Sequence, residues 1–331
     1  MTRHNLITDV PGVRVGHAHC PDVISGVTSV IFDTDTRASA TTRGGAPGGR
    51  DTALLAPEMS VQGVHAVLLS GGSLFGLDAA GGAVAALREA SVGLRIGSAI
   101  VPVAVQAITF DLLNGGNKNW AASPPYWQLG WDATVAASPA PFPLGTIGGG
   151  YGATTANLKG GTGSASATTS GGHTVAALAV VNAVGSATVG ASHHFWAAPY
   201  EQNGEFGGHG WPSSVPADAL ALRIKGAAPP STTIALVVTD AVLDKPQCTR
   251  LAMMADDGLA RAIRPAHAPM DGDTVFAVAT LDKPLRDPMT DLTELGMVAA
   301  DCLARAIARG IHEATAPGGA YSGPPPYRSL Y

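Results

Sequence analysis

The sequence predicts an α+β protein in which strands prevail early in the chain and helices return near its end. Residues 6–33 alternate apolar and polar side chains at a period of two, as half-buried strands do. The last third reads as strand 234–239, helix 246–264, strand 274–280 and helix 292–314, and Leu295, Val298 and Cys302 recur at helical spacing. The 42 glycines and 24 prolines indicate many tight turns. Together these features favour layered sheets and helices over a helical bundle.

The elements between these two regions are predicted in chain order. A buried strand at 64–73 ends in a glycine turn, a helix follows at 75–90, and a long apolar element follows at 99–113. Residues 114–146 and 190–217 read as polar surface excursions, and 173–189 as a strand, a turn and a second strand. The tail at 318–331 is too rich in glycine and proline to be helical. No internal repeat is visible, so we expect residues 1–331 to form a single domain.

Composition narrows the choice of partners. Charged residues make up 14% of the chain, the formal net charge is −5, and no run of lysine or arginine occurs, which argues against nucleic-acid and membrane partners. A monomer of this size normally has more ionic groups on its surface. The low fraction of charged residues therefore predicts that much of the surface is buried between subunits of a homo-oligomer. Three scattered cysteines in no CxxC pattern indicate reduced thiols of a cytoplasmic protein, with no metal site. No targeting or membrane-spanning segment is expected.

Familiar catalytic motifs are incomplete. "SGGSLFG" at 70–76 has Phe75 where a nucleophile elbow needs glycine, which favours a turn at Ser73. "GGGYGATTANLKGG" is not a phosphate-binding Walker A loop, because Lys159 is followed by glycine and not by serine or threonine. The segment can still be interpreted as a glycine-lined cleft that contains one lysine. The histidine pairs match no metal motif. We therefore predict no metal and no other cofactor.

Two adjacent hydroxyl residues lie where a proline-containing segment gives way to an apolar strand. Ser231 and Thr232 follow the proline-broken segment 226–230 and precede the apolar run 234–238 of a buried strand. Strand propensity alone accounts for a threonine there. A threonine at a chain's amino terminus is also a nucleophile, because its own α-amine, with a pKa of about 7.7 to 8.0, serves as the base. For a mid-chain threonine, an N-to-O acyl shift and ester hydrolysis must first cut the preceding peptide bond.

Two further positions have equally plain alternatives. Asp271 and Asp273 flank Gly272 directly before strand 274–280. They form either an aspartate–glycine turn or a carboxylate pair that orients a hydroxyl or an amine. Asn182 stands between apolar residues at a strand end, as either a turn former or a donor to an oxyanion.

Nine short motifs follow one another along nearly the whole chain: "VPGVRVGH", "RGGAPGGRDTALL", "LSGGSLFGLDAAGG", "VPVAVQAITFDL", "GTIGGGYGAT", "KGGTGSAS", "AVVNAVG", "STTIALVVTD" and "MDGDTVFAVAT". In this order they resemble the N-terminal-nucleophile hydrolases grouped with the aminopeptidase DmpA and the nylon-oligomer hydrolase NylC. The resemblance implies a four-layer αββα sandwich that cuts itself into an α and a β chain. It also implies that the residue opening the β chain is the nucleophile.

Carried over by position, the resemblance places the cut between Ser231 and Thr232, giving chains 1–231 and 232–331. Thr232 would then be both nucleophile and, through its new α-amine, base. Asn182 would stabilise the oxyanion. Asp271 and Asp273 match a pair of acidic positions in the nylon-hydrolase branch, which implies that they orient Thr232.

Other catalytic and substrate positions also follow from the resemblance. Lys159 stands at the "KGG" of the aminopeptidase branch, whereas the catalytic lysine of the nylon branch aligns with Asn157. The glutamate with which the aminopeptidases hold a substrate's free amine is replaced by Gln106, and a tyrosine of the nylon branch is replaced by Phe110. We therefore expect weak discrimination in favour of a free amino terminus, unless an acid such as Asp111 or Glu201 takes the glutamate's place.

The function that these features predict is a self-processed amide hydrolase, a peptidase or amidase, that assembles as a tetramer-like homo-oligomer of processed αβ units. Its substrates would be small peptides, amino-acid amides or ω-amino-acid (nylon-type) oligomers. Three alternatives remain: an aminopeptidase that requires a free amino terminus, an acyltransferase of the ornithine-acetyltransferase type, and a catalytically silent small-molecule-binding relative.

Overall fold

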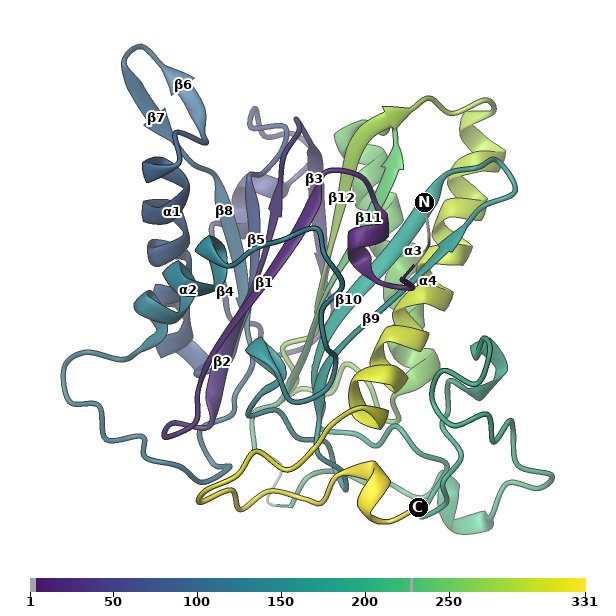
Figure 1. Cartoon of the computed structure of the whole chain (residues 1–331). Coiled ribbons are helices and arrows are strands. Elements are labelled where there is room, and N and C mark those ends of the chain that lie inside the picture. Colours follow the sequence, from purple (N-terminus) through teal and green to yellow (C-terminus); the bar gives the residue numbers. More distant parts are fainter. Residues whose placement is uncertain (1–3, 227–228) are drawn as a thin grey trace.

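A computed structural model describes residues 4–226 and 229–331, which form four layers (Figure 1). Two five-stranded sheets face each other, with helices α1 and α2 outside one sheet and α3 and α4 outside the other. This arrangement confirms the predicted α+β class and the αββα sandwich. The helices are α1 (Ala79–Glu89), α2 (Tyr126–Val135), α3 (Lys245–Ala262) and α4 (Pro288–His312).

Each sheet contains one parallel pair of strands among antiparallel neighbours. The first sheet has the order β1 (Val13–Cys20), β2 (Ser25–Phe32), β5 (Ala66–Ser70), β8 (Ala104–Ile108) and β4 (Gly49–Arg50), with β5 and β8 parallel. The second has the order β3 (Arg37–Thr42), β12 (Thr274–Lys283), β11 (Thr232–Ala241), β10 (Thr174–Asn182) and β9 (Gly161–Thr168), with β11 and β12 parallel. A separate hairpin joins β6 (Leu94–Ile96) to β7 (Ala99–Val101).

Strand β11 shows why its sequence is apolar throughout. Leu236 and Val238 point into the core between the two sheets, while Ala235 and Val237 point into the core beneath α3 and α4. Because successive side chains of a strand face opposite ways, a strand buried on both faces loses the alternation of a surface strand. The apolar run after Thr232 therefore marks a central strand.

The strand directions bring four separated positions to one end of the second sheet. β11 begins at Thr232, and the parallel strand β12 begins just after Asp273, so both strands start at the same end. β10 is antiparallel to β11 and ends there, with Asn182 paired opposite Thr232. The sheet order therefore places the predicted nucleophile between the asparagine and the acidic pair.

Three local predictions were wrong. Residues 114–146 are not wholly irregular, because they contain α2, which buries Tyr126, Leu129 and Ala133. Residues 173–189 contain one strand, β10, and continue as a loop with isolated bridges. The apolar element at 99–113 is interrupted at Pro102 into β7 and β8, because proline has no N–H to donate to a ladder.

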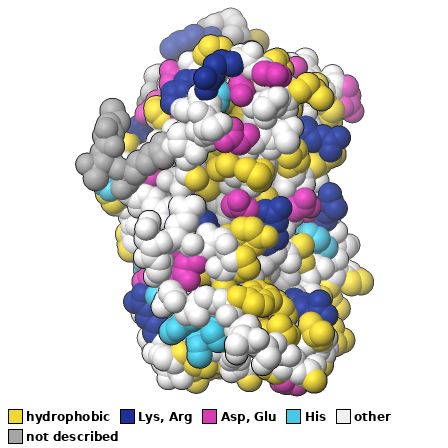
Figure 2. Space-filling model, turned by 90° about the vertical axis from the view of Figure 1, so that its right-hand side faces the viewer, with side chains coloured by type: hydrophobic (Ala, Val, Ile, Leu, Met, Phe, Trp, Pro, Cys, Tyr) yellow, Lys and Arg dark blue, Asp and Glu magenta, His cyan; other side chains and the backbone are white. Residues whose placement is uncertain are grey.

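Figure 2 shows the face of the molecule on the side of α4, where acidic and basic side chains are interspersed with hydrophobic ones. On α3 and α4, Met253, Met289 and Met297 are exposed. In the part of the chain that the structure describes, no helix combines the length and the apolar character needed to cross a membrane.

Candidate active site

The bond between Ser231 and Thr232 lies buried at the start of β11, with Ser231 1% and Thr232 3% exposed. The Thr232 hydroxyl donates a hydrogen bond to the carbonyl oxygen of Ser231. The backbone N–H of Gly272 donates to the same oxygen at 2.9 Å, and the N–H of Ser231 donates to the carbonyl of Met270 at 3.0 Å. The residue before the strand is therefore anchored, and its carbonyl oxygen faces two donors.

Gly272 fits closely against the threonine. A Cβ atom at this position would lie 2.8 Å from both the Thr232 hydroxyl oxygen and the carbonyl oxygen of Ala46. Such contacts are too short for any side chain. The aspartate–glycine pattern in the sequence thus permits a close backbone approach to Thr232.

Asp271 and Asp273 are both 1% exposed and are held by backbone donors. Asp273 accepts a hydrogen bond from the N–H of Thr233 at 2.7 Å, directly beside Thr232. Asp271 accepts from the N–H groups of Val184 at 3.2 Å and Ala268 at 3.3 Å. Burial, together with the nearby negative charge of Asp273, raises the pKa of Asp271 well above its usual value. Among the described hydrogen bonds, none joins either carboxylate directly to the Thr232 hydroxyl.

His267 completes this side of the site, and no sequence motif points to it. Its N–H and its ring Nδ1 both lie 3.0 Å from Asp273 Oδ2, and its Nε2 lies 3.3 Å from Asp256 Oδ2. Arg43 Nε lies 3.1 Å from the same oxygen of Asp256. The hydrogen bonds to Asp256 and Asp273 raise the pKa of His267 to about 10. The available signal was a histidine four residues before the acidic pair.

Asn182, on the other side of Thr232, is fully buried and makes contacts far along the chain. Its Oδ1 accepts from the N–H of Thr154 at 2.9 Å and from Nζ of Lys225 at 3.1 Å. Its Nδ2 donates to the carbonyl oxygen of Phe110 at 2.8 Å. A turn-forming asparagine bonds its own neighbouring backbone. These long-range contacts favour a positioned amide.

Two buried lysines lie near this asparagine. Lys159 donates to the carbonyls of Gly150 at 3.0 Å and of Ala153 and Gly160 at 2.8 Å, so its ammonium holds the glycine-rich loop together. Burial lowers the pKa of Lys159 to about 7. Burial also lowers the pKa of Lys225 to about 7, against the opposing effect of the carboxylates of Asp271 and Asp111. Asn157, the other candidate for the lysine position, donates to Thr188 Oγ1 at 3.3 Å.

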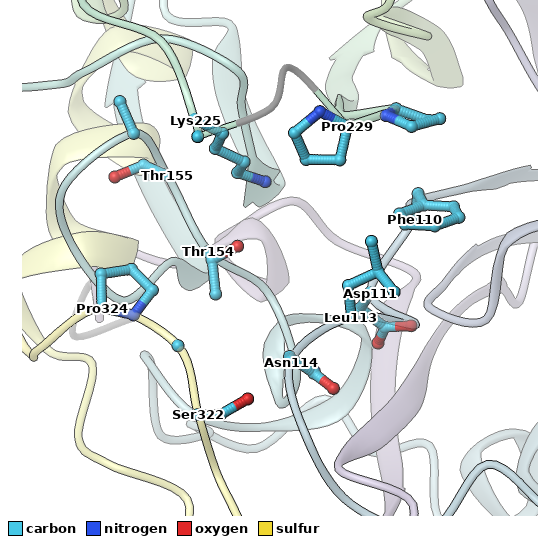
Figure 3. A pocket seen from close by; sticks show the side chains of 14 residues that line it. Phe110, Asp111, Leu113, Asn114, Thr154, Thr155, Lys225, Pro229, Ser322 and Pro324 are labelled. Atoms are coloured by element: carbon cyan, nitrogen blue, oxygen red, sulfur yellow. The ribbon is translucent and has the colours of Figure 1, made fainter.

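A pocket of about 430 Å³ opens beside these residues (Figure 3). Asp111 provides a carboxylate and Lys225 an ammonium at its wall, with Phe110 as an apolar surface. The other lining residues that the structure describes are Leu113, Asn114, Thr154, Thr155, Ala156, Gly226, Pro229, Pro230, Ser322, Gly323 and Pro324. Residues 227 and 228, in the segment before the predicted cut, lie outside the described residues.

Gln106 is not among the residues that line this pocket. It is fully buried in β8, where its Oε1 accepts from the N–H of Ala80 at 3.0 Å and its Nε2 donates to the carbonyl of Gly76. Both ends of the amide are therefore used to hold the start of α1 and the turn before it. The expectation that Gln106 meets the substrate is not supported by this position, and the carboxylate at the pocket is that of Asp111.

The described residues contain no group of three or more His, Cys, Asp or Glu side chains arranged to hold a metal ion. The three histidines of the 190–217 excursion, His193, His194 and His209, pack against one another in tilted and edge-on orientations without such an arrangement.

The αββα sandwich with a buried hydroxyl at the head of a central strand defines a fold of the N-terminal-nucleophile hydrolase class. A solved L-aminopeptidase D-Ala-esterase/amidase from Ochrobactrum anthropi, described as a variant of that fold, is similar with a TM-score of 0.65. The two chains are 22% identical, and the match covers 94% of this chain and 86% of the other. Residues 5–322 match the model of peptidase family S58, and the chain belongs to that family.

Two curated relatives extend the comparison. An uncharacterized aminopeptidase of Mycobacterium tuberculosis is 41% identical over 348 residues, covering 99% of this chain and 98% of the relative. A 6-aminohexanoate-oligomer endohydrolase of Kocuria sp. is 29% identical over 291 residues, covering 84% of this chain and 76% of the relative. The family resemblance seen in the sequence is thereby confirmed, as is the expectation of a hydrolase that acts on peptide or other amide bonds.

Proposed function

We propose that this peptidase cuts itself between Ser231 and Thr232 and then uses the released Thr232 to hydrolyse small peptides or related amides. The observation that supports this most strongly is the pairing at the bond itself. The Thr232 hydroxyl lies against the carbonyl that it would attack, and the Gly272 N–H, at 2.9 Å, faces the oxygen on which negative charge would develop.

Self-cleavage follows from this geometry in two steps. Thr232 Oγ1 adds to the carbonyl carbon of Ser231, the carbon–nitrogen bond breaks, and the hydroxyl proton ends on the nitrogen of Thr232. Water then hydrolyses the resulting ester to give a carboxylate on Ser231 and a free hydroxyl and amine on Thr232. Removing one oxyanion donor of this kind typically slows a reaction by about 10²–10³.

Turnover uses the same threonine. The α-amine of Thr232 takes the hydroxyl proton, Oγ1 attacks the substrate amide, and the leaving amine departs with a proton. Asn182 Nδ2 donates to the oxyanion of the tetrahedral intermediate. Water then hydrolyses the acyl ester and regenerates the enzyme.

The acidic pair and Lys159 support these steps without reacting with the substrate. Asp273 fixes the backbone beside Thr232 through the N–H of Thr233. Burial and the neighbouring Asp273 raise the pKa of Asp271, so this carboxyl takes up a proton more readily than an exposed aspartate and suits the orientation of an amine that changes its charge. Lys159 holds the loop whose Thr154 N–H fixes Asn182.

The pocket favours the aminopeptidase form of this function. Its volume of about 430 Å³ suits a small substrate, and Asp111 supplies a carboxylate at its wall. That carboxylate accepts hydrogen bonds from the Ser25 hydroxyl at 2.7 Å and the Gly72 N–H at 2.8 Å, and a substrate ammonium would bind as a further, charged donor. The expectation of weak selectivity rested on Gln106, which lies elsewhere. Pro229 and Pro230 line the pocket in the uncut chain, so cleavage after Ser231 would free that part of the wall to move.

Paired substitutions test the proposed nucleophile. Thr232→Ala removes the hydroxyl, and we expect neither self-cleavage nor hydrolysis of a dipeptide or amino-acid amide. Thr232→Ser keeps a hydroxyl and should retain both at a reduced rate. Hydrolysis by the alanine variant at the wild-type rate would contradict the proposal. An acyltransferase would instead show rapid product formation only when an amine acceptor is added, and a silent binding protein would show none.

The assembly and the compartment remain proposals as well. We propose a homo-oligomer of processed αβ units, supported by the low charge and the exposed methionines of α3 and α4. We also propose a cytoplasmic location, supported by the three free, scattered cysteines. Sedimentation of the purified protein tests the first part, and a single-unit mass would contradict it.

A further inference from the structure

Lys225 is a buried lysine to which the proposed steps assign no role. It reaches the pocket from the segment that precedes the cut, and the residue is 8% exposed (Figure 3). Its Nζ donates to the backbone oxygen of Asn182 at 3.0 Å and to its side-chain Oδ1 at 3.1 Å. Among the described hydrogen bonds, Nζ has no acceptor outside Asn182. Since burying an ammonium is costly, this contact with one residue calls for an explanation.

The chemistry of the two groups explains what the contact does. An asparagine side chain carries a carbonyl oxygen on one side and an NH₂ group on the other, and a half-turn exchanges them. A lysine ammonium can only donate hydrogen bonds, so it favours the orientation of the amide in which the acceptor Oδ1 faces it. The N–H of Thr154, 2.9 Å from the same oxygen, adds to that preference.

The fixed orientation decides where the amide can donate. With Oδ1 held by Lys225, Nδ2 lies on the opposite side and donates one hydrogen to the Phe110 carbonyl at 2.8 Å. An amide nitrogen has two hydrogens, so the second is free for an oxyanion at the neighbouring Thr232. A flipped amide would present an oxygen to that charge and repel it.

We propose that Lys225 is a positioning residue that holds the amide of Asn182 with Nδ2 directed toward the reacting carbonyl. This inference rests on the proposed function, in which Asn182 stabilises the oxyanion. It also assigns the segment before the cut a lasting role, since it requires the contact between Lys225 and Asn182 to persist after the chain is divided.

The test is a double-mutant cycle between Lys225 and Asn182. Lys225→Met keeps the apolar stem and removes the donors. We expect kcat per cleaved chain to fall about tenfold to a hundredfold, the range expected for a misplaced catalytic group, with KM within about twofold of wild type. Lys225→Arg, which keeps the donors, should recover part of the loss. In an Asn182→Ala background, Lys225→Met should cause little further loss of kcat, because the group it orients is gone.

Lys245 provides the matched control. It is also a buried lysine, and its Nζ donates to the carbonyls of Leu54, Met59 and Val61 at 2.8, 3.1 and 2.7 Å, but it does not line the pocket. Lys245→Met should lower the melting temperature and leave kcat per cleaved chain unchanged. Intact-mass measurement gives the cleaved fraction of every variant, so that slow maturation is not mistaken for slow turnover.

Three outcomes would overturn the inference while leaving the proposed function intact. These are an unchanged kcat in Lys225→Met, a rise in KM with kcat preserved, and losses from Lys225→Met and Asn182→Ala that multiply independently. The second would make Lys225 a substrate contact. If Lys225→Met does not fold, Lys225→Gln is used in the same cycle. A wild-type chain that neither cuts itself nor hydrolyses amides would refute the proposed function instead.

Discussion

The charge of His267 gives a prediction whose size can be worked out from the structure. The side chain is 21% exposed and lies between Asp256 and Asp273, and its pKa rises from an ordinary value of 6.5 to about 10. Each pKa unit corresponds to about 1.4 kcal/mol, so the full shift would set an upper limit of about 5 kcal/mol. Because water screens the exposed part, we expect about 2–3 kcal/mol.

The sign of this contribution follows from the direction of the shift. The folded chain binds the His267 proton more tightly than the unfolded chain, so the stabilisation is complete below pH 6.5 and disappears as pH rises through about 10. The lowered pKa values of Lys159 and Lys225 act in the opposite sense between about 7 and their ordinary value of 10.5. Those groups are present in both proteins of a matched comparison, so their effects largely cancel.

The assay compares His267→Gln with the parent chain in a Thr232→Ala background, in which we expect the chain to stay in one piece. Urea unfolding at a series of pH values gives the free energy of unfolding of each. We expect the variant to be about 2–3 kcal/mol less stable at pH 6.5, with the difference shrinking toward zero above pH 10. A difference that stays constant across this range would show that His267 contributes packing alone and would refute the reasoning.

Three further predictions concern the site. Asp271→Asn and Asp273→Asn should each slow self-cleavage and turnover by about 10² or more while the chain stays folded. The control is Asp282→Asn, at an exposed aspartate, which should change neither rate. Full activity of a folded Asp273→Asn variant would favour a simple turn. Gly272→Ala should slow self-cleavage by more than about tenfold, because its Cβ would lie 2.8 Å from the Thr232 hydroxyl oxygen and the Ala46 carbonyl oxygen. The control is Gly318→Ala, where the added Cβ would have open space around it. Equal rates of cleavage in the two variants would contradict the close fit. An amide with a free amine should be hydrolysed with a kcat/KM at least about a hundredfold above that of its acetylated form, a difference of roughly 2.7 kcal/mol. Asp111→Asn should remove most of that preference. Equal rates for the two substrates would favour the oligomer-hydrolase interpretation instead.

Much of the fold was predictable because its central strands and long helices carry strong periodic patterns. Strand β9 was not, since its sequence of glycine, serine, alanine and threonine lacks a strand's usual bulk. The structure supplies the reason: a Cβ on Gly163 would lie 1.9 Å from the carbonyl oxygen of Ala306 in α4. Small residues there permit close packing against a helix far along the chain, which no local pattern reveals.

The site shows the same division. Thr232 and the acidic pair stand at strand starts, where sequence patterns and family resemblance indicate them. Lys225 and His267 lie in irregular segments, and each acquires meaning only through partners from other elements, such as Asn182 on β10 and Asp256 on α3. Gln106 shows the converse, since a substitution relative to a family pattern does not reveal whether the side chain faces a pocket or the core.

Intact-mass measurement of the purified, active protein, combined with amino-terminal sequencing, tests the central claim most directly. We predict two polypeptides whose masses correspond to residues 1–231 and 232–331, the smaller one beginning Thr-Thr-Ile, and a single uncut polypeptide for Thr232→Ala. Full hydrolytic activity from a chain that remains intact, or a β chain beginning at any other residue, would contradict the account.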